Sequence, residues 1–123
     1  MIKNILLIGL GGGLGSIARY ATSHLALKYL TTIIPYGTFI ANILGSLLIG
    51  IFLGILLENP SQTFKLLLVT GFCGGYTTFS TFTYENFSFL QSGQIGLFLL
   101  YSLGSIAAGL LAVFIGFSLV KWI

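Results

Sequence analysis

The chain has 123 residues, of which 56% are hydrophobic and only 6% are charged, and its mean hydropathy is +1.06. A water-soluble domain carries about a quarter charged residues, so these few charges cannot cover a globule in water. The net charge of +3 comes from basic residues scattered along the chain, whereas nucleic-acid binding needs a clustered basic face. The composition predicts an integral membrane protein and excludes a soluble domain and a nucleic-acid-binding protein.

Charged and turn residues divide the sequence into four apolar segments, each with the roughly 20 residues that a membrane span needs. The turn Glu58-Asn59-Pro60-Ser61 ends the second segment, and Gln91-Ser92-Gly93-Gln94 separates the third from the fourth. Four spans place both termini on the same side of the membrane. We expect an all-α membrane protein with a single four-helix transmembrane domain over residues 1–123, with spans at about 3–28, 34–57, 65–90 and 95–121.

The third segment contains a pattern that would weaken a helix near its middle. Gly74 and Gly75 are followed by four hydroxyl residues within six positions. Non-helical backbone at membrane depth is tolerated only where it is buried in protein or lines a wet cavity, and its freed carbonyl oxygens suit a small cation. The alternative is a kinked helix whose hydroxyls bond back to their own backbone.

Polar and aromatic residues share helix faces in two of the segments. Thr38, Asn42 and Ser46 follow one another at every fourth position and therefore line one face of the second helix. An asparagine there offers two N–H donors, for an ion or for a neighbouring helix. Phe79 and Phe82 share a face of the third helix, either to pack or to present their positive ring edges to an anion path.

Two charges need a role within or near the spans. Arg19 can snorkel, pair with an acid such as Glu85, or attract anions at a vestibule. His24 stands alone, and no nucleophile and base occur with a third group to orient them. The sequence therefore predicts no enzymatic activity.

Glycine occurs 17 times, mostly inside the spans, and often four residues from another small residue. Without a hydrophobic drive between helices in lipid, close backbone approach supplies the packing. Four thin helices are poorly suited to enclosing a pore alone, which favours an oligomer. The alternative is that the glycines only pack helices within one subunit.

Three stretches, residues 11–20, 37–46 and 71–82, resemble the Fluc/CrcB family of bacterial fluoride channels, and the four-span layout matches over the whole chain. The resemblance implies a third helix broken mid-membrane and an antiparallel, dual-topology homodimer in the cell membrane. It also implies two pores for passive fluoride export from the cytoplasm, which relieves fluoride toxicity.

The resemblance further implies roles for the candidate site residues other than Arg19. A structural sodium ion at the dimer interface would be held by the main-chain carbonyls of Gly74 and Thr77. Glu85 matches an acidic position of the family beyond the two phenylalanines, whereas the role of Arg19 as a vestibule or structural charge rests on the residues alone. The fluoride pore would be lined by Asn42, Phe79, Phe82, Thr38, Ser105 and Tyr101.

Two other functions are compatible with a small four-helix membrane protein. A small multidrug/proton antiporter needs a membrane-embedded acid, and the first, second and fourth segments contain none within their spans. A non-transporting assembly subunit would show no conductance, and it leaves the polar face of the second helix without a purpose.

Overall fold

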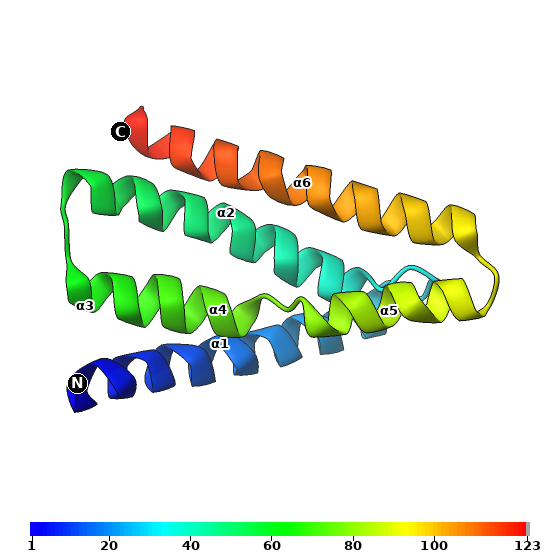
Figure 1. Cartoon of the computed structure of the whole chain (residues 1–123), viewed down its shortest axis with the longest axis horizontal. Helices are drawn as coiled ribbons and strands as arrows, with labels where there is room; N and C mark the ends of the chain where they lie inside the picture. Colours follow the sequence, from blue (N-terminus) through cyan, green and yellow to red (C-terminus); the bar gives the residue numbers. More distant parts are fainter. Residues whose placement is uncertain (123) are drawn as a thin grey trace.

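The chain runs back and forth in four helical passes in a computed structural model that describes residues 1–122 (Figure 1). Three passes are continuous helices: α1 (Ile2–Tyr29), α2 (Tyr36–Glu58) and α6 (Ile95–Lys121). Each of these is long and apolar enough to cross a membrane. Both chain ends lie at the same end of the bundle (Figure 1), as an even number of spans predicts.

The third pass consists of four pieces in sequence. These are α3 (Gln62–Phe64), the π-helix η1 (Lys65–Cys73), α4 (Gly74–Tyr76) and, after residues 77–79, α5 (Ser80–Gln91). Thr77 has the extended ψ of 158° that ends α4. The π-helical stretch was not expected from the sequence, because nothing in the residue pattern of 65–73 distinguishes it from an α-helix.

The turns between passes form where the sequence predicts them. After α2 ends at Glu58, the Ser61 hydroxyl accepts a hydrogen bond from the Phe64 N–H at 3.3 Å and thereby caps the next helix. Between α5 and α6, Gly93 has a φ of +72°, which an L side chain rarely adopts.

Glycines bring the helix backbones into direct contact. On α1, a Cβ at Gly15 would meet the Phe72 carbonyl oxygen, and a Cβ at Gly75 of α4 would meet the Gly12 carbonyl oxygen. On α6, a Cβ at Gly116 would meet the Leu47 carbonyl oxygen of α2. These glycines therefore pack helices against one another within one chain. For these positions, this is the alternative to oligomer contacts that the sequence left open.

Other small residues and most large apolar side chains face outward. A Cβ at Gly9, Gly13 or Gly104 would meet nothing within 4 Å. Leu110 and Phe114 on α6 are 70% and 69% exposed. Apolar side chains turned outward along three spanning helices show a multi-pass membrane protein, because lipid is the solvent that accepts them.

Candidate functional site

A groove of about 610 Å³ runs along the face shared by α2, the third pass and α6. Its walls are mostly apolar, and it opens to the outside of the subunit along one side. The groove brings together six of the candidate site residues proposed from the sequence: Asn42, Gly74, Thr77, Phe79, Phe82 and Ser105.

Asn42 lies at the centre of this group and contacts the main chain where the third pass leaves helical geometry. Its Oδ1 accepts a hydrogen bond from the Thr78 N–H at 2.7 Å, and its Nδ2 donates to the Thr78 carbonyl oxygen at 3.0 Å. The carboxamide thus pairs with both main-chain groups of one residue, as a neighbouring strand would. One of its two N–H groups remains for another acceptor.

The carbonyl oxygens around the interruption are free. Among residues 1–122, no hydrogen bond ends on the carbonyl oxygens of Gly74, Gly75, Tyr76 or Thr77. A Cβ at Gly74 would meet nothing within 4 Å, so the approach to this backbone is open. Hard main-chain oxygens with an open approach fit a small cation such as sodium.

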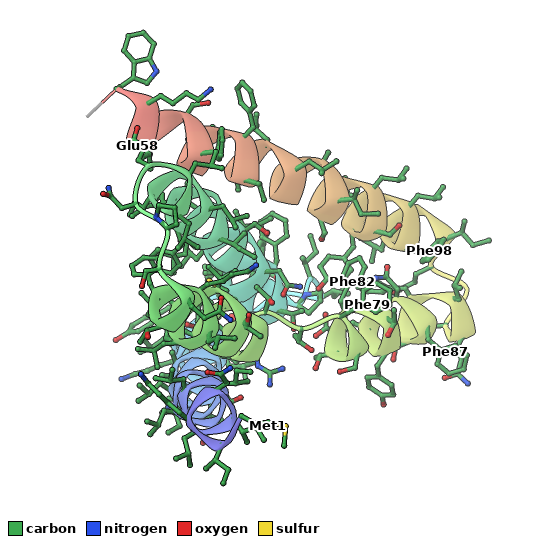
Figure 2. All side chains as sticks on the ribbon, turned by 60° about the vertical axis from the view of Figure 1, so that its left-hand side comes forward. Met1, Glu58, Phe79, Phe82, Phe87 and Phe98 are labelled. Atoms are coloured by element: carbon green, nitrogen blue, oxygen red, sulfur yellow. The ribbon has the colours of Figure 1, made fainter. Side chains whose placement is uncertain are left out.

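The two phenylalanines lie together at the start of α5, as Figure 2 shows. Their ring centroids are 6.2 Å apart at an interplanar angle of 41°, and Phe82 lies 5.2 Å from the ring of Tyr101. Phe79 is 77% exposed on the open side of the groove, while Phe82 is half-buried. These angles do not stack the rings face to face, so ring edges are available to the groove.

Ser105 lines the groove and has a buried hydroxyl without a partner. Its Oγ is buried and makes no hydrogen bond within residues 1–122. By contrast, the Ser102 hydroxyl, one turn earlier on α6, donates to the Phe98 carbonyl oxygen at 2.6 Å. The Ser105 hydroxyl is therefore a hydrogen-bond donor without a partner at the wall of the groove.

Thr38 and Tyr101 do not line the groove but meet on Glu85 beside it. The Thr38 hydroxyl donates to Glu85 Oε1 and the Tyr101 hydroxyl donates to Glu85 Oε2, each at 2.5 Å. The three residues come from α2, α5 and α6, so the carboxylate joins three helices. Thr38 and Glu85 also line a second pocket of about 290 Å³.

Arg19 lies apart from this network. It is half-buried on α1, and within residues 1–122 it forms no ion pair with Glu85, whose oxygens accept from hydroxyls instead. The pairing of Arg19 with Glu85, one of the alternatives weighed from the sequence, is therefore not present within residues 1–122.

Sequence reasoning missed two residues. Thr78 supplies the main-chain partner of Asn42, but it stands in a run of hydroxyl residues that gives no sign of which one α2 contacts. Asn86 is 6% exposed, and its Oδ1 has no partner among residues 1–122. The available sequence signal for Asn86 was its polar amide directly after Glu85.

Comparison with known proteins gives matches along nearly the whole chain. A family model described as "CrcB-like protein, Camphor Resistance (CrcB)" matches residues 6–117. A protein of Flavobacterium psychrophilum is 48% identical over 98% of both chains, and one of Azobacteroides pseudotrichonymphae is 42% identical over 99% of both. One of Gloeothece citriformis is 46% identical over 95% of this chain and 96% of its own. All three are named "Fluoride-specific ion channel FluC", a name for ion channels and not for enzymes.

Proposed function

The chain belongs to the CrcB family, and on this premise we propose that it is a fluoride-selective channel that exports fluoride passively from the cytoplasm. Three relatives at 42–48% identity carry the name of such a channel. Export would relieve the toxicity of fluoride to cytoplasmic enzymes.

The observation that carries the proposal is the unpaired Ser105 hydroxyl in the same groove as the Asn42 amide. Fluoride is small and strongly hydrated, so a selective pore must replace its water with hydrogen-bond donors. The Ser105 O–H and the second N–H of Asn42 are such donors, and the edges of Phe79 and Phe82 add positive potential without binding tightly.

The proposed functional unit is an antiparallel, dual-topology homodimer with two pores. The groove opens outward, and Phe79, a proposed pore residue, is largely exposed at this open side. A second copy on this face would cover the phenylalanine and complete the walls. Thr38, Glu85 and Tyr101 would extend the polar lining of the path beyond the phenylalanines, and Arg19 would attract anions at its mouth.

The free carbonyls of Gly74 and Thr77 are the proposed ligands of a structural sodium ion at the dimer interface. Gly74 is exposed at the open side of the groove, so two copies could bring their carbonyls together there. A sodium ion would supply positive charge that holds carbonyl dipoles from both subunits.

Anion efflux from liposomes containing the purified protein tests the function. We expect rapid loss of fluoride and negligible loss of chloride. Ser105→Ala should slow fluoride efflux, while Ser102→Ala, which removes a hydroxyl already bonded to its own helix, should leave it unchanged. Folded protein that releases no fluoride would refute the proposal, and proton-coupled uptake of an organic cation would then indicate the antiporter.

A further inference from the structure

The main chain of the third pass has two possible partners for the Thr78 N–H. In a continuous α-helix this group would donate to the Gly74 carbonyl oxygen, four residues earlier. In the structure it donates to Asn42 Oδ1 at 2.7 Å, and the Gly74 carbonyl oxygen receives no hydrogen bond from residues 1–122. Asn42 therefore accepts the hydrogen bond of the N–H group that would otherwise continue the helix.

The last regular helical hydrogen bond of this segment is made one residue before Thr78. The Thr77 N–H donates to the Cys73 carbonyl oxygen at 3.0 Å, and the Thr77 hydroxyl donates to the same oxygen at 2.8 Å. Helical hydrogen bonding thus ends at the Thr77 N–H, and the next N–H group, that of Thr78, bonds to the Asn42 amide.

A second contact from α2 fixes the same segment. A Cβ at Gly45, three residues after Asn42, would meet the Thr77 side chain at Cγ2. Because Gly45 has no side chain, Thr77 can sit against α2 while Thr78 pairs with the amide. Adjacent residues of the interruption are therefore held from one helix by two different interactions.

We propose that Asn42 is a positioning residue for the cation site, in addition to any contact that it makes with an anion. Its carboxamide withholds the Thr78 N–H from Gly74 and so keeps the Gly74 and Thr77 carbonyls free as cation ligands. This inference rests on the sodium site of the proposed function but needs no fluoride conduction. An asparagine that only donated to an anion in the pore would have no influence on sodium.

The test compares sodium binding in variants with the complete chain in detergent. The readout is the rise in the thermal unfolding midpoint when N-methylglucamine chloride is replaced by increasing sodium chloride, since a bound ion stabilises only the folded protein. Asn42→Leu keeps a side chain of similar size, removes both hydrogen bonds and returns the Thr78 N–H to Gly74. We expect the sodium concentration for half-maximal stabilisation to rise by about tenfold or more, the change that losing one hydrogen bond can bring.

Two further variants separate positioning from anion contact. Ser105→Ala removes a proposed anion donor whose hydroxyl forms no hydrogen bond within residues 1–122, so its sodium response should match that of the wild type even if fluoride efflux slows. Asn42→Asp keeps a side-chain oxygen that can accept from the Thr78 N–H and removes the donor to an anion. It should therefore keep the sodium response that Asn42→Leu loses, even though fluoride efflux is lost, so that the loss in Asn42→Leu is assigned to the missing acceptor.

The outcomes distinguish this inference from the channel function. A wild-type protein that conducts fluoride but does not respond to sodium would overturn the inference and leave the channel intact. A normal sodium response in Asn42→Leu would also overturn it, as would a response in Asn42→Asp as weak as that in Asn42→Leu. A wild-type protein that responds to sodium but passes no fluoride, with the response weakened in Asn42→Leu and kept in Asn42→Asp, would support the inference and refute the function.

Discussion

The close contact between α1 and the third pass makes a quantitative prediction at Gly15. A Cβ placed there would lie 2.8 Å from the Tyr76 nitrogen and closer still to the Phe72 carbonyl oxygen, whereas ordinary contact begins at 3.4 Å. In Gly15→Ala the two backbones must therefore separate by at least about 0.6 Å. Both obstructing groups are backbone and cannot rotate aside, so the overpacking should cost about 1–3 kcal/mol.

Gly13→Ala is the matched control on the same helix. A Cβ at Gly13 meets nothing within 4 Å, so this variant gains only the higher helix propensity of alanine, about 1 kcal/mol. Both variants share that gain, and the difference between their stabilities isolates the contact with the third pass. We expect Gly15→Ala to be less stable than Gly13→Ala by about 1–3 kcal/mol.

The assay is reversible unfolding in mixed micelles, followed by far-ultraviolet circular dichroism as the denaturing detergent fraction rises. Separating α1 from α4 should also displace the interruption that follows α4, so Gly15→Ala should respond less to sodium than Gly13→Ala. Equal stability of the two variants would refute the close approach of the backbones at Gly15.

Three further predictions concern the polar groups of the site. Thr38→Val should lower the free energy of unfolding by about 1–3 kcal/mol, because it leaves one Glu85 oxygen without a donor; a double-mutant cycle with Tyr101→Phe should show coupling through the shared carboxylate, and simple additivity would contradict it. Asn42→Asp should abolish fluoride efflux from liposomes, since it places an acceptor where a donor belongs, and undiminished efflux would argue against that role. Prolonged removal of sodium should disable fluoride efflux in the wild-type protein, whereas indifference to sodium would count against ligation by the Gly74 and Thr77 carbonyls.

Local chemistry made the membrane-spanning helices predictable. Lipid requires long apolar segments, and three of them are present as single helices. The turn at Glu58-Asn59-Pro60-Ser61 was also predicted, and α2 ends at its first residue. Such signals lie within a few neighbouring residues, so they can be interpreted without knowledge of the fold.

The geometry of the third pass could not be predicted in the same way. The adjacent glycines Gly74 and Gly75 remain helical, and the chain leaves helical geometry only at Thr77. The main-chain groups of Thr78 bond to Asn42, which is 36 residues earlier in the sequence. A local weakness therefore indicated the region, whereas a contact from another helix determines where the helical bonding stops.

The candidate site shows the same division. Helical spacing placed Thr38 and Asn42 on one face, but it did not indicate that Thr38 would donate to Glu85 and not enter the groove. Likewise, the serines of the fourth helix look alike in sequence. Only the tertiary fold leaves Ser105 without a partner while Ser102 bonds to its own helix.

The divided third pass has a consequence for how the protein is made. No single helix in this pass is long and apolar enough to cross a membrane, unlike α1, α2 and α6. Its free carbonyls and hydroxyls are costly in hydrocarbon until other helices cover them. The helices that supply Gly15 and Asn42 are synthesised first, so a nascent third pass meets partners already in the bilayer. Chain order, and not hydrophobicity alone, thus makes membrane insertion of this segment favourable.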